Sequence, residues 1–542
     1  MNTARIGMVK RSQLALRLLI ACLFSIPLVW LVYKIGVNAP FQDELTFNNL
    51  YSEILSDGML DLRELISSHN GHPLLIPKFL IGLTLRLGLP WVWLMYAQIA
   101  LLSIAYLFAA ARLGEIKNIS DAVALFSLAF AIFSARQWEN LYWAMQIAFP
   151  LYLALSFGAF FYVQRYASSR NVADLCVALL LAFCATTSHG AGIFTLILTC
   201  AAVLLIRHSA RDIILSAVFV SSGVAYFVCA QSASTSSGVG GGIPNFPELI
   251  HHAIQMLALT WFDFGKQKVT AEIFAIFFAL VLVLAFARVL RSRPLYTFEF
   301  LSILIGLIVV LGVSFARVSA GIFQPDASRY VSLVIPISVG SILIFHKFNW
   351  RFLSIISLLI LILSYSLSYS RELKLSAIRR HNMEEAKAAL CTEGKVHPVH
   401  NIGSVVPLAT IDNLRRLFCR AFVRIEHTNI EISGSQGFFQ EDSQTWIAPR
   451  FLTQIPPSGV HVVVIRGWLP DVSGYPDDTF SLSVFANGER IGTSRLSAGG
   501  GFEVRAELPH GSSSLRIEST KRLKVGEDVR ELSWVLETIE FL

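Results

Sequence analysis

The chain has 542 residues, of which 54% are hydrophobic and only 15% are charged, and its mean hydropathy is +0.59. This composition excludes an ordinary soluble domain and is typical of a polytopic α-helical membrane protein. The formal net charge of +7 does not indicate a nucleic-acid partner, because the basic residues stand in short clusters between apolar runs, where they set membrane topology.

The N-terminal segment combines a basic start with a long apolar run. Arg5, Lys10 and Arg11 precede apolar residues at about 14–36. This run is longer than the apolar core of a secretory signal peptide, so we interpret it as an uncleaved signal anchor, although Ala39 leaves room for cleavage.

Apolar runs long enough to cross a bilayer recur along the first two thirds of the chain. They predict eleven membrane-spanning helices, at 14–36, 90–111, 119–135, 146–164, 172–188, 190–206, 213–230, 271–288, 296–316, 329–345 and 352–370. Segments 73–88 and 247–264 are also apolar, but proline, histidine or charged side chains interrupt them. We interpret both as interfacial or re-entrant helices. If both crossed the membrane, the chain would have thirteen spans.

The positive charges sort the predicted loops onto two faces of the membrane. With the N-terminus in the cytoplasm, every predicted inner loop is basic and contains Arg112 and Lys117, Arg165 and Arg170, Arg207 and Arg211, Arg288, Arg291 and Arg293, or Lys347 and Arg351. The same arrangement assigns polar segments to the outer face, at 43–44, 69–72, 136–143, 188–190 and 317–330. One face therefore receives all the candidate functional segments of the spanning region.

A predicted outer loop at about 231–270 contains the Ser/Gly-rich run SASTSSGVGGG. No side chain in such a run favours a single backbone path, so we expect a mobile segment. It is either a lid over a substrate groove or a plain linker.

The composition changes after Ser370, where apolar runs shorten and charges increase. We predict that a spanning domain over 1–370, with a long outer loop at 37–89, is followed by a helical connection over 371–429. From 430 to 542 the pattern is that of a β-sandwich. Residues 480–484 and 502–508 alternate between apolar and polar side chains, and the intervening Ala486-Asn487-Gly488-Glu489 is a signal for a type I′ hairpin.

The seven cysteines divide between the two regions. Five lie within apolar spans, where Cys behaves as a small hydrophobic residue: Cys22, Cys176, Cys184, Cys200 and Cys229. Cys391 and Cys419 lie in the polar tail. If that tail is extracytoplasmic, these two can form a disulfide, and no Cys-x-x-Cys spacing indicates a structural metal.

The long outer loop contains the most reactive candidates. Asp43 or Glu44, just beyond the first span, is well placed to take a proton from an acceptor hydroxyl, although each could equally be a solvated loop acid. His69 and His72 are separated by a turn signal and could contact phosphate, bind a metal, transfer a proton, or cap the following helix. Two histidines without a third ligand are a weak metal signal.

Two later outer segments are candidates for substrate contacts. Trp138, Glu139 and Asn140 combine aromatic and polar groups as sugar-binding clefts do, or they belong to an interfacial aromatic belt. Arg317, Arg329 and Tyr330 could bind an anionic ligand, or the arginines could snorkel to the interface. Similar alternatives apply to Lys78 and His189. In the tail, a sugar-binding face and a hydrophobic core remain alternatives for Trp446, Trp468 and Trp534.

The combination of FQDEL, HNGHPLLIPKF, QWENLYWAMQ and SRY, in a protein with this many spans, resembles the GT-C glycosyltransferases over residues 14–370. The resemblance implies a polyprenyl-phosphate sugar donor and transfer to an envelope glycan, lipid or protein on the outer face of a bacterial cytoplasmic membrane. It also implies an inverting displacement with Asp43 as base and Glu44 as the alternate.

The family has no fixed motif for its phosphate-binding basic residues, so Arg317 and Arg329 are assigned by position alone. The run HPLLIPK matches only loosely the His-Pro and Lys pattern of protein mannosyltransferases and aminoarabinose transferases, which leaves the acceptor class open. A divalent cation is compatible with the resemblance but is not required. The C-terminal region is similar to β-sandwich tails of some bacterial glycosyltransferases, which implies carbohydrate binding.

Two other functions remain as alternatives. A lipid-linked sugar flippase or polysaccharide exporter would place charges along a path through several spans, whereas the predicted spans contain few. An O-antigen-type polymerase or ligase would depend on a large late outer loop, a role that only the loop at 231–270 could take.

Overall fold

The computed structural model describes residues 2–41, 44–45, 47, 50–52, 54, 62–69, 72–207, 209–232, 245–259 and 261, scattered positions between 276 and 291, and residues 297–319, 327–393, 411, 413–414, 417–418, 438–441, 444–447, 450–454, 462–468, 480–496, 501–510, 514–519 and 534–541. The chain divides into two compact units. The first comprises Met1–Glu384 and Val399–Val405, and the second comprises Glu385–Pro398 and Val406–Leu542.

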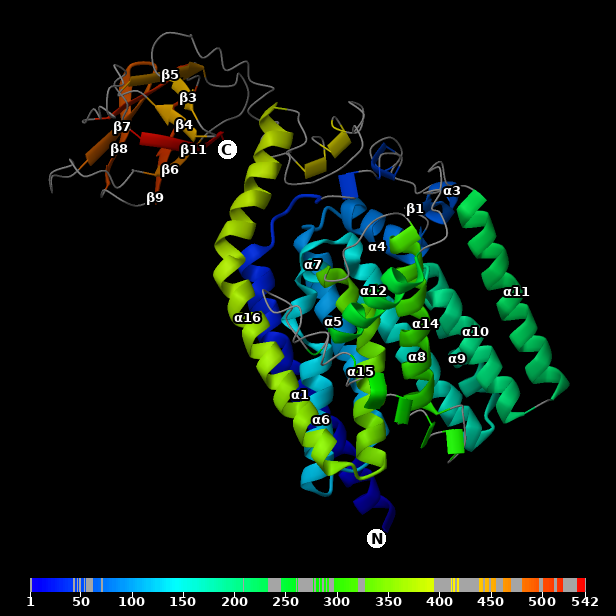
Figure 1. The fold of residues 1–542 in the computed structure, drawn as a ribbon. Coiled ribbons are helices and arrows are strands. Elements are labelled where there is room, and N and C mark those ends of the chain that lie inside the picture. Colours follow the sequence, from blue (N-terminus) through cyan, green and yellow to red (C-terminus); the bar gives the residue numbers. More distant parts are fainter. Residues whose placement is uncertain are drawn as a thin grey trace. The chain divides into compact units, whose positions relative to one another are not determined.

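The first unit is a bundle of long apolar helices (Figure 1). The main ones are α1 (Asn2–Ile35), α5 (Val92–Ala110), α6 (Ile119–Ile132), α8 (Ala148–Ser169), α9 (Val172–Ser188), α10 (Gly192–Ile206), α11 (Ala210–Ser232), α14 (Phe298–Ser319), α15 (Val331–Lys347) and α16 (Arg351–Ala388). Among the described residues, eight helical segments are long and apolar enough to cross a membrane, and α9 and α10 are shorter apolar helices. The protein is therefore a polytopic helical membrane protein.

Ten of the eleven predicted spans correspond to these helices, and the span predicted at 271–288 lies mostly outside the described residues. The two doubtful segments form α4 (Leu75–Arg86, 12 residues) and α12 (Phe246–Ala258, 13 residues). Helices of this length extend about 20 Å, which is less than the thickness of a bilayer core. Their lengths favour the interfacial interpretation over the thirteen-span alternative.

The central helix of the bundle is α15, because 94% of the apolar stretch that contains it is buried. It packs against α14 through two glycines. A Cβ atom at Gly306 of α14 would overlap the side chain of Ile337, and one at Gly340 of α15 would lie 2.6 Å from the carbonyl oxygen of Glu299. Small residues let helix backbones approach closely in membranes, where the hydrophobic effect does not drive helix association.

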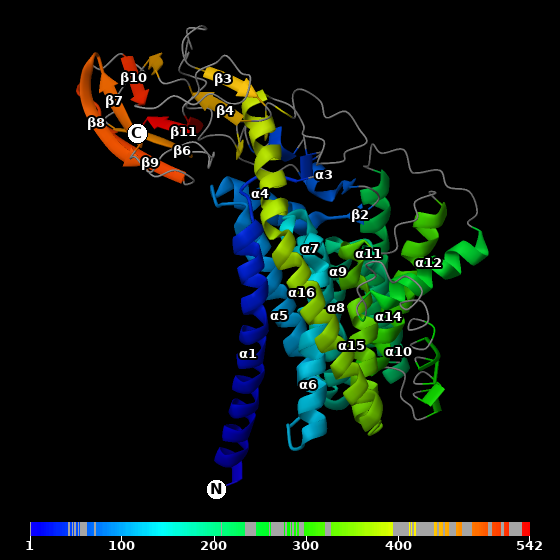
Figure 2. The same ribbon diagram turned by 60° about the vertical axis from the view of Figure 1, so that its left-hand side comes forward.

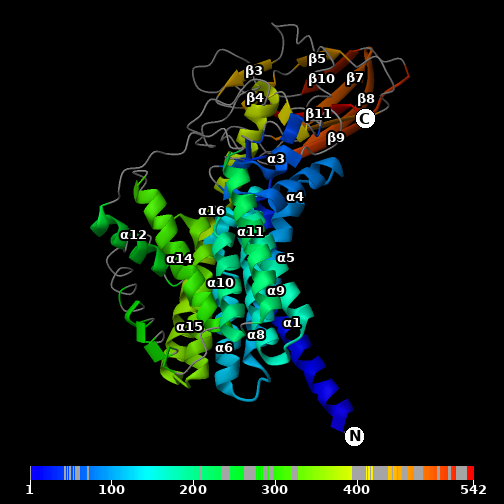
Figure 3. The ribbon, with the colours of Figure 1, turned by 90° about the vertical axis from the view of Figure 1, so that its right-hand side faces the viewer.

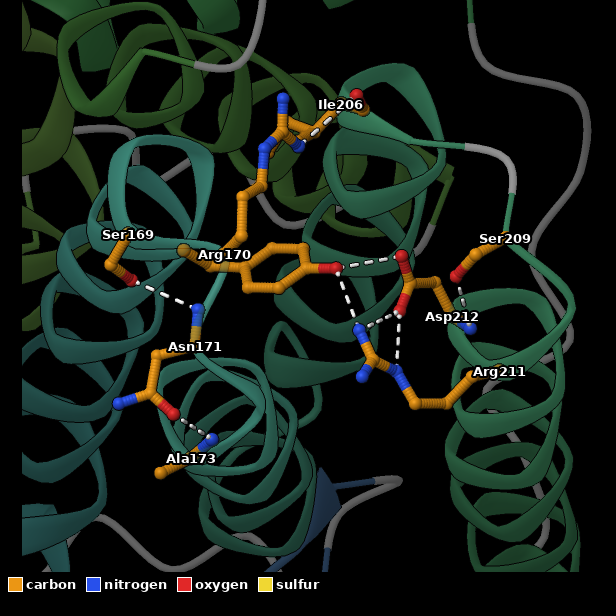
Figure 4. Close-up of polar contacts among 9 residues, drawn as sticks. Ser169, Arg170, Asn171, Ala173, Ile206, Ser209, Arg211 and Asp212 are labelled. Atoms are coloured by element: carbon orange, nitrogen blue, oxygen red, sulfur yellow. Dashed lines mark hydrogen bonds and ion pairs between the residues drawn. The ribbon is translucent and has the colours of Figure 1, made fainter.

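At one end of the bundle, hydrogen bonds join the termini of α8, α10 and α11 (Figure 4). The Tyr166 hydroxyl donates to Asp212 Oδ2 at 2.7 Å, and Arg211 Nε donates to Asp212 Oδ1 at 3.1 Å. Arg170, at the left-handed C-cap of α8, donates to the carbonyl of Ile206. Asp212 is fully buried, and these donors compensate its charge. Basic residues of two predicted inner loops thus serve to connect helix ends.

Short elements gather at the end of the bundle away from the N-terminus (Figures 1 and 3). The first of them, from the long loop, are α3 (Leu62–Ile66), the paired strands β1 (Ser68–His69) and β2 (His72–Pro73), and α4. Between α6 and α8 the chain forms η3 (Ala135–Gln137), α7 (Trp138–Tyr142) and η4 (Met145–Ile147), and η5 (Ser328–Tyr330) leads into α15. Elsewhere, η2 (Ala111–Leu113) follows α5. These short helices, turns and strands contain most of the predicted site residues.

The last long helix, α16, continues without interruption from the final predicted span into the first part of the predicted connection, as far as Ala388 (Figure 2). It ends in the π-helical turn η6 (Ala389–Glu393), which contains disulfide-bonded Cys391. The five cysteines of the apolar spans are free. Cys419, the other member of the predicted pair, lies outside the described residues, so the pairing stays a prediction.

The second unit contains two antiparallel sheets. The strands are β3 (Phe438–Glu441), β4 (Gln444–Ile447), β5 (Arg450–Gln454), β6 (Val462–Trp468), β7 (Phe480–Ala486), β8 (Glu489–Leu496), β9 (Gly501–Glu507), β10 (Ser514–Ser519) and β11 (Trp534–Phe541). Their orders are β5-β10-β7-β8 and β3-β4-β11-β6-β9. The predicted hairpin is confirmed: Ala486 pairs with Glu489, and Asn487 and Gly488 both have positive φ, as a type I′ turn requires.

Replacing Gly340 with alanine should destabilise the protein, because the new methyl group would lie against the backbone of α14. Overpacking of this kind costs about 1–3 kcal/mol. The control is Gly312→Ala on α14, where no heavy atom lies within 4 Å of the new Cβ and alanine is the better helix former. Thermal unfolding in detergent should show a lower melting temperature for Gly340→Ala alone. Equal melting temperatures would contradict the packing.

Candidate functional site

The first feature of the site is the buried carboxylate of Glu44, which has no exposed surface. Its Oε2 accepts hydrogen bonds from the backbone N–H of Phe41 at 2.7 Å and from Nε1 of Trp91 at 3.1 Å, and its Oε1 accepts one from the backbone N–H of Met145 at 2.7 Å. Glu44 therefore connects the long loop to the start of α5 and to η4. Asp43, the predicted base, lies outside the described residues.

Burial and hydrogen bonding act in opposite directions on Glu44. Burial disfavours the charged form and is the larger effect, while the N–H donors favour it, and the result is a pKa raised to about 7. With both oxygens engaged by donors and no exposed surface, Glu44 has no atom with which to meet a substrate hydroxyl. Its position is that of a structural carboxylate rather than an alternate base.

Lys78 of α4 is also buried and fixes the loop from a second side. Its Nζ donates to Glu64 Oε1 at 3.0 Å and to Ser67 Oγ at 2.7 Å, as well as to the carbonyl oxygens of both residues. The ammonium group also lies 5.9 Å from the centre of the Phe47 ring. A lysine surrounded in this way orders α3 and β1 against α4, so its contacts are structural rather than those of a free substrate ligand.

The two loop histidines face each other across the β1–β2 ladder, as the predicted turn requires. His69 packs edge-on against Phe47, with ring centres 4.7 Å apart. His72 stacks on His189, which follows α9, at 5.0 Å and an interplanar angle of 16°. The helix-cap alternative for His72 is wrong, because the N-cap of α4 is Leu74 and no side chain caps it.

The His72 ring packs against both Gly190 and His189. A Cβ atom at Gly190 would lie 2.8 Å from Nδ1 of His72, so only glycine leaves room for the imidazole. His189 accepts a hydrogen bond at Nδ1 from the backbone N–H of Ala191. In the neutral ring this fixes the proton on Nε2, which is then a donor.

These histidines are neutral at pH 7. Burial lowers the pKa of His69 to about 3, with Lys78 and His72 as further causes, and it lowers the pKa of His189 well below its usual value. His72 is exposed to solvent, yet burial followed by the charge of Arg317 lowers its pKa to about 4.

Arg317 lies in the last turn of α14, and its charge contributes to the lowered pKa of His72. Its guanidinium carbon lies 5.7 Å from the centre of the Tyr330 ring. Within the described part of the chain it has no ion pair and no hydrogen bond, and it is only partly exposed. An incompletely solvated guanidinium without a counter-ion is suited to an anionic ligand.

Arg329 differs from Arg317 in having a carboxylate partner. Its Nη1 lies 3.6 Å from Glu139 Oε2, and its backbone N–H donates to the same oxygen at 3.0 Å. Its guanidinium lies 5.3 Å from the centre of the Tyr330 ring. Tyr330 therefore contacts both arginines, of which only Arg329 is neutralised by a carboxylate.

Asn140 completes the connection between α7 and the start of α15. Its Nδ2 donates to Ser332 Oγ at 2.7 Å and to the carbonyl of Arg329 at 3.1 Å. Ser332 in turn donates to Gln137 Oε1 at 2.8 Å. The structure thus brings together Glu139, Asn140, Arg329 and Tyr330, which are about 190 residues apart in sequence.

Several buried polar atoms near these contacts have no hydrogen-bond partner among the residues that the structure describes. They include Asn140 Oδ1, Tyr142 Oη, Trp143 Nε1, Gln146 Oε1 and Tyr330 Oη, on side chains with less than a tenth of their surface exposed. Buried polar groups are normally satisfied by protein, water or ligand. So many unpaired polar atoms in one segment indicate a polar interior. Ordered water or a hydroxyl-rich ligand would supply the missing hydrogen bonds.

Sequence reasoning missed two contacts of the site. Trp91, at the start of α5, donates to Glu44, and Arg379 of α16 lies over the ring of Trp138 at 3.4 Å. In the sequence, Arg379 belongs to a cluster of basic residues just beyond the last predicted span, and that cluster could have indicated a functional contact. Among the described residues, no group of three or more His, Cys, Asp or Glu side chains gathers as metal ligands do.

Stability should fall as the pH rises from about 4.5 to 7, because the folded pKa of Glu44 lies above the unfolded value and the folded state holds its proton longer. The slope from one such group is about 1.4 kcal/mol per pH unit. Melting curves from pH 5 to 8 should show that Glu44→Gln loses this part of the dependence, while the exposed control Glu489→Gln keeps it. Parallel curves for wild type and Glu44→Gln would contradict the assignment.

Comparison with known proteins gives a weak structural likeness. No protein-family model matches the chain, and no curated protein sequence matches it. The structure is similar to that of arabinosyltransferase EmbB from Mycobacterium smegmatis, determined by single-particle cryo-EM, with a TM-score of 0.38 and 9% identity over 96% of this chain. The chain spans 64% of the length of that enzyme. At this level of similarity the likeness assigns no family and no activity.

Proposed function

We propose that the protein is a membrane glycosyltransferase that moves a sugar from a polyprenyl-phosphate donor to an envelope glycan, lipid or protein acceptor. The reaction occurs at the end of the bundle that carries α3, α4 and α7, on the outer face of the membrane. The proposal is based on the resemblance of the sequence motifs to the GT-C enzymes and on the chemistry of the side chains at this end.

The observation that carries the proposal is the environment of Arg317. A guanidinium without a carboxylate partner in the described part of the chain lies beside the ring of Tyr330, and its charge contributes to the lowered pKa of His72. A neutral imidazole adds a hydrogen-bond donor without adding charge. This combination suits a phosphate group presented at the membrane surface, because phosphate takes several donors and needs a cation. Arg329, paired with Glu139, has a secondary role that depends on that pair.

The reaction that fits these groups is a single displacement. An acceptor hydroxyl attacks the anomeric carbon, its oxygen forms the new glycosidic bond, and the bond from that carbon to the donor phosphate oxygen breaks. Asp43 takes the hydroxyl proton, while Arg317 stabilises the charge on the departing polyprenyl phosphate. Hydrogen bonds occupy both carboxylate oxygens of Glu44, so we assign the role of base to Asp43.

The sugar and the acceptor would meet the motif at 137–146. The partly exposed ring of Trp138 supplies an aromatic contact, and polar atoms of Asn140 and Gln146 that have no partner among the described residues supply hydrogen-bonding capacity. A flippase would need charged or polar side chains along the length of several spans. In the described spans the charged residues stand mainly at helix ends, which favours a transferase.

Asp43→Asn should lower sugar transfer at least about 100-fold, because general base catalysis typically contributes a factor of that order or more. The assay is release of polyprenyl phosphate from a panel of radiolabelled polyprenyl-phosphate sugars in proteoliposomes. Asp61→Asn, another acid of the same loop, is the control and should retain activity. If Asp43→Asn transfers sugar at the wild-type rate while correctly inserted, the catalytic assignment is wrong.

Arg317→Gln should weaken binding of decaprenyl phosphate by about 10- to 100-fold, the range expected for charge-assisted hydrogen bonds. Native mass spectrometry of the detergent-solubilised protein gives the dissociation constant for decaprenyl phosphate. Arg351→Gln, which removes an exposed charge at the start of α16, should leave binding unchanged. Equal affinities for Arg317→Gln and wild type would remove Arg317 from the donor site.

A further inference from the structure

Arg379 of α16 contacts the candidate site from outside the motifs that define it. We propose that Arg379 is a positioning residue, which holds Trp138 in place and thereby couples α16 to the Glu139–Arg329 pair. The part of this proposal that concerns ligand binding rests on the proposed function. The part that concerns the geometry of Trp138 does not.

The contact between Arg379 and Trp138 is short. The guanidinium carbon lies 3.4 Å from the ring centre, well inside the limit of about 6 Å for cation–π attraction. The indole also packs against Tyr142, with ring centres 5.7 Å apart. A planar guanidinium against an aromatic face is a favourable stacking geometry that lysine does not reproduce. Trp138 is therefore held between α16 and its own helix.

Arg379 is itself fixed by a buried carboxylate. Its Nη2 lies 3.0 Å from Glu372 Oε2, and Arg371 Nε lies 3.1 Å from Glu372 Oε1. Glu372 has no exposed surface. Residues 372 and 379 are seven positions apart, which places them on one face of the helix two turns apart. Moving Arg379 away would leave a buried charge with one fewer partner, which is costly.

The contacts continue from Trp138 to the site. Trp138 is the first residue of α7, and Glu139, the next residue, accepts a hydrogen bond from the backbone of Arg329 and pairs with its guanidinium. A change in the position of Trp138 is therefore transmitted to the side chain that neutralises Arg329. Because α16 is one continuous helix to Ala388, a displacement of its end would reach the site by this route.

The neighbouring Arg380 supplies a matched control on the same turn of α16. It pairs with Glu384 at 2.6 Å, and both side chains are about half exposed. Arg379 and Arg380 have the same charge and the same helix propensity. They differ in that Arg379 contacts both Trp138 and the buried Glu372, so Arg379→Lys, which keeps a charge beside Glu372, separates loss of the stacking contact from loss of the ion pair.

The experiment has two readouts on the detergent-solubilised full chain. The first is the emission of Trp138, obtained by subtracting the spectrum of Trp138→Phe from that of its parent, in wild-type, Arg379→Ala and Arg380→Ala backgrounds. The second is the dissociation constant for decaprenyl phosphate in the same variants. Arg379→Lys, which keeps a charge for Glu372 but lacks the flat guanidinium, serves where Arg379→Ala does not fold.

We expect Arg379→Ala to shift the Trp138 emission and to weaken decaprenyl phosphate binding about tenfold, with Arg380→Ala unchanged in both. The effects of Arg379→Ala and Trp138→Phe on binding should be non-additive, because the arginine acts through the indole. An unchanged emission, or additive effects on binding, would overturn the proposal. If wild type does not bind decaprenyl phosphate, the proposed function fails, and the emission alone decides the positioning role.

Discussion

The buried carboxylate of Glu44 fixes the long loop to the helix bundle. Glu44 brings a negative charge into a fully enclosed position, and such a charge is tolerated only when donors surround it. The donors come from three separate parts of the chain: the loop itself, the start of α5 and the start of η4. Because these parts must converge on the two oxygens, the long loop is fixed to the bundle beside the motif at 137–146.

The distribution of counter-ions divides the basic residues of this end into two groups. Lys78 and Arg329 have carboxylate partners, Glu64 and Glu139, and they order the protein around them. Arg317 has none in the described part of the chain, and burial together with its charge lowers the pKa of His72. The combination of the Arg317 guanidinium with neutral hydrogen-bond donors and aromatic rings is suited to an anion with an attached polar group.

The sequence predicted those parts of the fold that local pattern determines. Apolar runs located the helices because a spanning segment must be apolar along its length. Asn487-Gly488 located its hairpin, because few residues adopt positive φ in succession. The interfacial interpretation of segment 73–88 has the same basis: Pro73 lies before the helix and Pro77 lies in its first turn, and the helix has only 12 residues.

The site was predictable as a set of residues but not as a set of roles. Asp43 and Glu44 are adjacent in the sequence. The local sequence does not indicate that Glu44 accepts a hydrogen bond from the backbone of Met145, 101 residues away. Likewise, Arg317 and Arg329 look equivalent in sequence, and only the approach of Glu139, 190 residues from Arg329, distinguishes them. Roles that depend on such distant partners come from tertiary structure alone.

The most direct test of the account is a cryo-EM structure of the protein in lipid nanodiscs with decaprenyl phosphate. The account predicts phosphate density within hydrogen-bonding distance of the Arg317 guanidinium, beside the ring of His72, with the polyprenyl chain leading into the bilayer. Phosphate density at the opposite end of the bundle, beside Arg165 and Arg170, or a bound lipid that leaves Arg317 without contact, would contradict it.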